Sequence, residues 1–138
     1  MGTVVIQPRD NGLEIHLAGH WVQGDAQHLH RLLHQHLNQQ HEAVLINLSQ
    51  LLSCDDGARH GLAVTHQTLH DAVDRVVYLS NTPKWRSLAT WVLHHAKDRS
   101  TPVVMNRQQA EVNLSQPIPR LDGAHERLQQ WVGREQTS

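Results

Sequence analysis

Residues 43–73 read AVLINLSQLLSCDDGARHGLAVTHQTLHDAV, and this stretch decides the fold. Residues 43–48 form a short apolar run rich in β-forming side chains, which is typical of a strand covered on both faces. The polar residues 49–57 predict a loop, and apolar residues at helical spacing predict a helix over residues 58–73. The sequence therefore predicts a buried strand that leads through an acidic turn into an amphipathic helix.

The acidic turn Asp55-Asp56-Gly57 lies where that helix is predicted to begin. Free backbone amides and the positive end of the helix dipole gather at a helix N-terminus, so Asp55 or Asp56 is well placed as the N-cap. Capping is the expected main role of this pair. Because functional residues of α/β sheets gather at the carboxyl ends of strands, the turn is also the first candidate binding site.

Strands and helices alternate along the rest of the chain. Asn11-Gly12 is the preferred dipeptide of a tight hairpin turn, so the chain is predicted to open with two antiparallel strands. The predicted elements are strands at 3–7, 13–18, 76–80 and 102–105, helices at 26–37, 83–96 and 122–132, a loop at 19–24 with Asp25 as a helix cap, and an irregular segment at 107–119. This order predicts one α/β domain, residues 1–138, with a mainly parallel mixed sheet of about five strands, an N-terminal antiparallel hairpin and about four helices.

The composition narrows the class of protein. With 138 residues, of which 38% are hydrophobic and 18% charged, the chain is long enough and apolar enough to bury a core. A net charge of -1 gives no reason to expect a nucleic-acid partner. No apolar run approaches the ~20 residues that span a bilayer, and no secretory signal stands at the N-terminus, so a cytoplasmic location is expected.

Catalytic motifs are absent from the sequence. Cys54 is the single cysteine, which excludes an internal disulfide and a cysteine-rich zinc site, and two neighbouring aspartates oppose its ionisation. Neither a G-x-S-x-G nucleophile elbow nor a glycine-rich phosphate loop occurs. The adjacent side chains of Asp55 and Asp56 point in different directions, which is poor geometry for an acid–base pair. We therefore expect a protein that is not an enzyme and needs no cofactor.

Thirteen histidines outnumber the twelve lysines and arginines. His30 and His34 are four residues apart on one predicted helix, as are His66 and His70 on another, so each pair shares a helix face. Neither pair fits the H-E-x-x-H protease motif, because no glutamate follows its first histidine. Solvated helix faces are the expected place for these side chains and no metal ligand is assigned. Among them, His30, His36 and His66 lie beside apolar stripes and are expected to be partly desolvated.

The aromatic residues are four tryptophans, one tyrosine and no phenylalanine. Trp85 falls on the apolar stripe of the helix predicted at 83–96, while Trp91 lies off the centre of that stripe and is expected to be partly exposed. Trp21, in the loop after the second strand, and Trp91 either form an apolar patch for binding or complete the core. The sequence leaves both interpretations open.

Several segments of the chain resemble a known family. Val44–Ser49 and Cys54-Asp55-Asp56-Gly57 resemble the strand and the D-S-S-G turn of STAS domains, the sulphate-transporter and anti-sigma-factor-antagonist domains. The SpoIIAA-like branch, also described as STAS/CRAL-TRIO-like, is similar in Arg75–Leu79, in Lys84-Trp85 at a helix start and in the closing segment 126–132. The resemblance spans residues 3–132 and implies a non-catalytic α/β fold.

In signalling STAS domains the serine before the turn glycine is phosphorylated by a partner kinase. Asp56 takes that place here, so the resemblance implies a permanent carboxylate with about half the charge of a phosphate. Regulation by phosphorylation at this position would therefore be missing.

The resemblance also implies a set of partners. The first expectation is an apolar small molecule or lipid, with peripheral membrane contact. A regulatory protein partner, as for an anti-sigma-factor antagonist, is the alternative. Apart from the resemblance, the thirteen histidines leave a histidine-rich metal-binding protein as the second alternative, and a homodimer stays open. The residues expected to bind the ligand or partner are Asp55, Asp56, Gly57, Trp21, Trp85 and Trp91.

Overall fold

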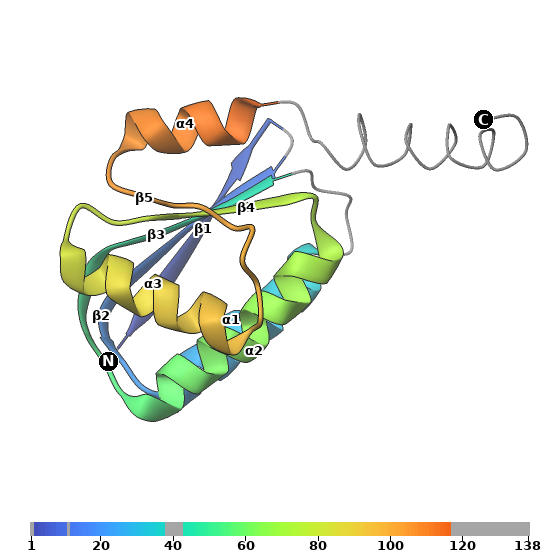
Figure 1. The fold of residues 1–138 in the computed structure, drawn as a ribbon. Coiled ribbons are helices and arrows are strands. Elements are labelled where there is room, and N and C mark those ends of the chain that lie inside the picture. The colour runs from blue at the N-terminus through green and yellow to red at the C-terminus, as the bar shows by residue number, and fades with distance from the viewer. Residues whose placement is uncertain (1, 11, 38–42, 117–138) are drawn as a thin grey trace, which may run out of the picture.

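The computed structural model describes residues 2–10, 12–37 and 43–116, and a five-stranded mixed sheet forms its centre (Figure 1). The strands are β1 (Thr3–Arg9), β2 (Gly12–Trp21), β3 (Ala43–Cys54), β4 (Arg75–Leu79) and β5 (Val103–Val104). They lie in the order β1-β2-β3-β4-β5 across the sheet. β1 and β2 form the predicted antiparallel hairpin, and all other neighbours pair in parallel. The predicted mixed sheet is thus confirmed.

The two longest strands, β2 and β3, continue beyond their predicted ends. The loops predicted at 19–24 and 49–57 are wrong over 19–21 and 49–54, because these segments pair with each other in parallel up to Trp21 and Cys54. They are also wrong over 23–24 and 56–57, where helices already begin. Leu51 is buried in the core between two more exposed neighbours, so strand alternation continues there. Bulges interrupt the pairing on either side of Gly19, which takes a φ of 82° that favours glycine.

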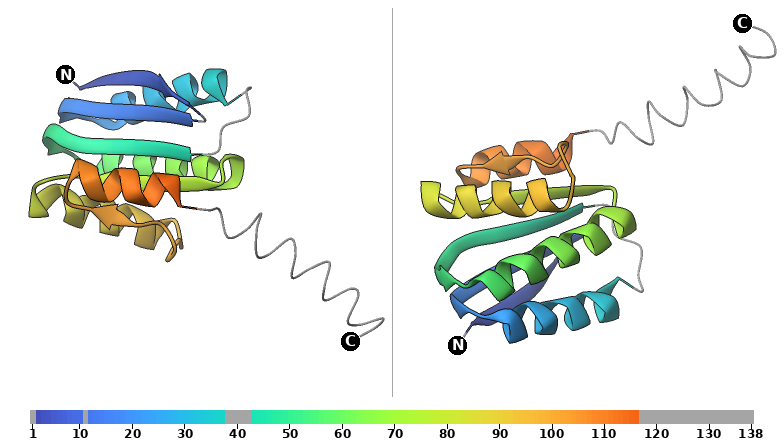
Figure 2. Two further views of the ribbon diagram at one scale, coloured as in Figure 1. Left: turned by 90° about the horizontal axis from the view of Figure 1, so that it is seen from above. Right: turned by 60° about the horizontal axis from the view of Figure 1, so that its bottom comes forward.

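Four helices pack on the sheet in the described part of the chain. α1 (Gln23–His36), α2 (Asp56–Ala72) and α3 (Pro83–His95) lie over one face, and α4 (Arg107–Ser115) lies over the opposite face (Figures 1 and 2). The predicted number of about four helices is confirmed. None of the described helices is both long enough and apolar enough to cross a membrane.

The central strands supply side chains to two separate apolar cores. Val44 and Ile46 of β3 belong to the larger core under α1, α2 and α3. Leu45, between them, belongs to a smaller core under α4, together with Val77, Leu79, Val104 and Ala110. Alternation along a strand covered on both faces explains why residues 43–48 are almost continuously apolar.

α4 occupies part of the segment 107–119 that the sequence predicts to be irregular, so that prediction is wrong over 107–115. The Asn106 side chain caps the helix by accepting a hydrogen bond from the Gln109 amide at 2.9 Å. Ala110 and Leu114, four residues apart, pack against the smaller core. The short apolar stripe of this helix explains why its pattern is weak in the sequence. The helix predicted at 122–132 lies outside the described residues.

The start of α1 also differs from its prediction. Val22, not Asp25, is the N-cap residue, and Asp25 lies in the first turn. The Asp25 carboxylate accepts hydrogen bonds from the backbone amides of Val22 at 2.9 Å and of Gly2 at 3.3 Å. Asp25 therefore satisfies a free amide at the helix start from inside the helix, and it also holds the beginning of the chain against α1.

A buried carboxylate joins α4 to the hairpin. Glu14 of β2 accepts hydrogen bonds from Arg9 at 2.7 Å and from Arg107 at 2.8 and 3.0 Å, and His16 contacts it at 2.5 Å. The hydrogen bond from Arg107 is the main cause that lowers the pKa of Glu14 from 4.5 to about 2, although burial opposes it. This network connects residues 93 positions apart in the sequence.

Candidate functional site

The candidate site is built around the N-terminus of α2, where β3 ends. Asp55 is the N-cap: its Oδ1 atom accepts a hydrogen bond from the Ala58 amide at 2.8 Å. The Asp55 amide donates to the Trp21 carbonyl at 3.0 Å, which holds the turn against the end of β2. The sequence predicted that either Asp55 or Asp56 caps the helix, and in the structure the cap is Asp55.

Asp56 is the first residue of α2 and faces solvent, with its side chain 81% exposed. It forms an ion pair with Arg59 on the next turn of the helix. Gly57 lies against α1, since a Cβ atom on this residue would be 3.0 Å from Gln23 Cβ. Capping therefore does not use the Asp56 carboxylate, which remains available at the surface.

Exposed apolar side chains accompany the acidic turn. Leu52, near the end of β3, is 63% exposed, and Val22, at the start of α1, is 48% exposed. The parallel pairing of Trp21 with Cys54 places these two chain ends next to one another. A carboxylate beside exposed apolar side chains is a combination suited to protein contact.

A cleft of about 620 Å³ runs along α1 and α2 from the same end of the molecule. The two helices approach closely there, since a Cβ atom on Gly61 would lie 2.6 Å from Ala26 Cβ. The cleft is lined by Gln23, Ala26, Gln27, His30, Arg31, Gly57, His60, Gly61, Val64 and Thr65. Polar and basic side chains thus share its walls with apolar ones.

The three tryptophans of the predicted site lie in different surroundings. Trp21 is 1% exposed and donates from Nε1 to the Ala18 carbonyl at 3.0 Å, so it completes the core. Trp85 is also buried in the larger core. Trp91 is half-buried: its ring stacks on His95 at 3.7 Å between centroids, and the Arg59 guanidinium lies 5.3 Å from the ring. Of the three, Trp91 alone reaches the surface beside α2.

Cys54 lies next to the turn but is poorly suited to nucleophilic chemistry. Burial, together with the negative charge of Asp55, raises the pKa of its thiol from 9.0 to about 11. The thiol is therefore protonated at neutral pH, and the thiolate is the reactive form.

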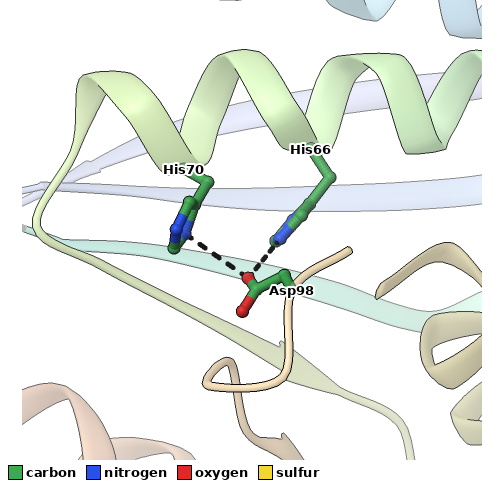
Figure 3. A group of neighbouring side chains, drawn as sticks. All are labelled: His66, His70 and Asp98. Carbon is green, nitrogen blue, oxygen red and sulfur yellow. Dashed lines mark hydrogen bonds and ion pairs between the residues drawn. The ribbon is translucent and has the colours of Figure 1, made fainter. Parts of the chain in front are cut away.

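A second cluster of polar side chains lies within the molecule, between α2 and the segment after α3 (Figure 3). His66 is buried, and its two ring nitrogens contact the Tyr78 hydroxyl at 2.9 Å and Asp98 Oδ2 at 2.7 Å. His70 Nδ1 lies 3.4 Å from the same carboxylate oxygen. The expected burial beside an apolar stripe is thus confirmed for His66 and, in part, for the half-buried His30. It is wrong for His36, which is exposed.

The electrostatics of this cluster follow from burial and hydrogen bonding. Burial is the largest influence on His66 and lowers its pKa, although Asp98 opposes it. Burial alone would raise the pKa of Asp98, but hydrogen bonds from Thr101, His66 and Ser100 together hold it well below its usual range. A neutral imidazole therefore faces an ionised carboxylate. Burial also raises the pKa of Tyr78.

Asp98 and Tyr78 were not predicted from the sequence as members of this cluster. Lys97 takes a φ of 59° just after α3, and the Asp98 amide then donates to the Leu93 carbonyl at 2.9 Å. This helix end is a Schellman motif, which reverses the chain and directs the following segment back toward α2. Glycine is usual at the left-handed position, so a lysine there gave no signal in the sequence.

No protein-family model matches the sequence, and a search of curated proteins finds no match. Solved structures do match. An anti-sigma factor antagonist from Mycobacterium paratuberculosis has a TM-score of 0.65 and 16% identity, over 84% of this chain and 96% of that one. SpoIIAA in its unphosphorylated form has a TM-score of 0.58 and 10% identity, over 88% and 99%.

A third structure, from Shewanella loihica, is an uncharacterized DUF3478-family protein with a SpoIIAA-like fold. Its TM-score is 0.58 and its identity 13%, over 82% of this chain and 93% of that one. Together these likenesses show the class of fold that the sequence resemblance predicted. The chain has a SpoIIAA-like α/β fold.

Proposed function

We propose that this chain is a STAS-type regulatory domain that binds a protein partner at the N-terminus of α2. The observation that carries the proposal is the exposed Asp56 carboxylate at the end of the sheet where the exposed apolar residues Leu52 and Val22 also lie. Two of the similar structures are anti-sigma factor antagonists, which supports a regulatory protein as the partner. Binding rather than catalysis is also supported by the protonated Cys54 thiol.

Asp56 has a defined role in this proposal. It pairs with Arg59 and presents a carboxylate at the surface, at the positive end of the helix dipole. A partner with a basic group beside an apolar patch would complement this surface. Because a carboxylate is always present, the domain would bind without a phosphorylation step.

The test is affinity capture of the partner from cells, followed by binding measurements with the purified pair. Leu52→Lys and Asp56→Lys should each weaken binding about tenfold or more, because both place a positive charge in the interface. Val112→Lys is the matched control: Val112 is 52% exposed on α4, over the opposite face of the sheet. Equal affinities for all three variants and the unchanged chain would refute the proposed surface.

An apolar small molecule or lipid is the second candidate, and the cleft between α1 and α2 is the observation that favours it. Its volume of about 620 Å³ is in the usual range for small-molecule sites. Native mass spectrometry of protein purified from cells should then show a bound mass that Val64→Trp removes, because the exposed Val64 lines the cleft and the larger ring would occupy it. A native mass spectrum that shows only the mass of the protein, with no bound species, would exclude this candidate.

A further inference from the structure

His66, His70 and Asp98 bring together three potential metal ligands from two parts of the chain. The two histidines are one turn apart on α2, and Asp98 follows α3, so all three side chains converge from opposite sides (Figure 3). One ligand atom from each residue lies within 4.8 Å of the other two. The cluster is separate from the surface proposed for partner binding.

We propose that His66, His70 and Asp98 bind a divalent transition-metal ion of the Zn²⁺ type. Two imidazole nitrogens and one carboxylate oxygen are a ligand set that Zn²⁺ prefers, whereas Mg²⁺ and Ca²⁺ prefer oxygen ligands. The ligand atoms are His66 Nε2, His70 Nδ1 and Asp98 Oδ2. The inference stands on this geometry and does not depend on the proposed regulatory function.

The two distances that join the Asp98 carboxylate to the histidines are close to those that a bound ion requires. Metal–ligand bonds of about 2.1 Å at tetrahedral angles separate the ligand atoms by about 3.4 Å. His70 Nδ1 and Asp98 Oδ2 are 3.4 Å apart. His66 Nε2 and Asp98 Oδ2 are 2.7 Å apart, as in a hydrogen bond, so this pair would separate by about 0.7 Å when the ion enters.

Neighbouring side chains orient the ligands. The Tyr78 hydroxyl lies 2.9 Å from His66 Nδ1, so with Nε2 on the metal the proton resides on Nδ1 and is donated to this hydroxyl. Asp98 Oδ1 accepts hydrogen bonds from the amide and the hydroxyl of Ser100, both at 2.8 Å, and Oδ2, which faces the histidines, also accepts one from the Thr101 hydroxyl at 2.5 Å. Such outer partners are typical of built metal sites.

The exposed side of the cluster provides a route for the ion. The His70 side chain is 50% exposed, while those of His66 and Asp98 are buried. An ion held by these three residues would therefore keep its fourth position toward solvent, where water completes the tetrahedron. A site with three protein ligands and one open position can also accept an anionic ligand.

The first experiment is a calorimetric titration of the metal-free 138-residue chain with Zn²⁺. We expect one ion to bind at this site, and His70→Gln to weaken that binding about tenfold or more. The matched control is the double variant His30→Gln/His34→Gln, which removes the exposed histidine pair on α1, whose Nε2 atoms are 3.1 Å apart. Binding that His70→Gln leaves unchanged, or that the control abolishes, would overturn the proposal.

The second experiment distinguishes metal ligation from a purely hydrogen-bonded cluster. Co²⁺ should give visible absorption bands of tetrahedral coordination that disappear in His70→Gln.

Tyr78→Phe keeps the shape of the buried ring but removes the partner of His66, and should weaken Zn²⁺ binding about 10–100-fold. Melting curves of each variant without metal verify folding. Zn²⁺ should raise the melting temperature of the unchanged chain; an equal rise with Mg²⁺, or none with Zn²⁺, would contradict the ligand set.

Discussion

The two adjacent aspartates at the start of α2 have different physical roles. Asp55 points its carboxylate back at the free amide of Ala58, while Asp56 points to solvent and pairs with Arg59. One residue therefore stabilises the helix and the other gives the surface its charge. Two neighbouring residues thus differ in role: Asp55 caps the helix, and Asp56 belongs to the proposed binding surface.

Stability measurements should separate these roles. Asp55→Ala should lower the free energy of unfolding by about 0.5–2 kcal/mol, because it removes the N-cap. Asp55→Ser should be nearly neutral, since a hydroxyl can replace the carboxylate. Asp56→Ala is the matched control and should cost less than about 0.5 kcal/mol, the usual contribution of an exposed pair on one helix. Urea unfolding measures all three; a larger loss in Asp56→Ala would reverse the assignment.

Glu14 should make the protein sensitive to acid. Its pKa in the folded protein, about 2, is below the ordinary value of 4.5, so folding favours the ionised form. The stabilisation is therefore fully present above about pH 4.5 and is lost as the pH falls toward 2. Glu14→Gln should lose about 1–3 kcal/mol at pH 7, because Arg9 and Arg107 lose a charged acceptor.

The check for Glu14 is a series of urea unfolding experiments from pH 7 to pH 2 at fixed ionic strength. The difference in stability between the unchanged chain and Glu14→Gln should shrink over the lower part of this range. A difference that is constant with pH would show that Glu14 is not held ionised by its arginine partners.

At the scale of elements, glycine decides how closely α1 and α2 approach. Gly61 of α2 faces Ala26 of α1, and the two helices have no room there for another methyl group. Gly24, in the first turn of α1, has no such neighbour, since nothing lies within 4 Å of where its Cβ would be. Gly61 therefore lies in a tight contact between two helices, whereas Gly24 has open space where its side chain would be.

Substituting alanine at each glycine should give opposite results. Gly24→Ala should stabilise the protein by about 0.4–1 kcal/mol, because alanine has the higher helix propensity and reduces the entropy of the unfolded chain. Gly61→Ala gains the same propensity but forces the helices apart, and should cost about 1–3 kcal/mol. Thermal and urea unfolding measure both; stabilisation by Gly61→Ala would show that the α1–α2 contact is loose.

At the scale of the whole molecule, the two faces of the sheet are covered unequally within residues 2–10, 12–37 and 43–116. Three helices and the larger core stabilise one face, while α4 covers the other with a small apolar cluster and the Glu14 network (Figure 2). Elements with few buried apolar contacts open at lower free energy than the rest of a domain. α4 should therefore separate from the sheet before the remainder unfolds.

Ala110→Asp tests this order of opening. The substitution places a charge in the smaller core, where burial of an unpaired carboxylate is unfavourable. Hydrogen exchange should become faster in α4 by about tenfold or more, while the amides of α1 and α2 keep their protection. Val112→Asp, on the exposed side of the same helix, is the control. Uniformly faster exchange in Ala110→Asp would show that both faces unfold together.

The acidic turn shows how much of the candidate site could be predicted. A carboxylate at a helix start is a local signal, and the turn Asp55-Asp56-Gly57 lies where the sequence predicts it. The tryptophan patch could not be predicted in the same way. Trp21 is in the core because β2 continues through it to pair with β3, a contact between segments more than thirty residues apart.

The sequence by itself determined the order of the five strands and of the helices α1, α2 and α3, and the antiparallel start of the sheet, because strand alternation, helical spacing and the Asn-Gly turn act between near neighbours. The tertiary structure alone decided the lengths of β2 and β3, the docking of α4 and the meeting of His66 with Asp98, 32 residues away. Those features depend on which surfaces pack together. Pairing and burial across the fold set them, and no local pattern in the chain carries that information.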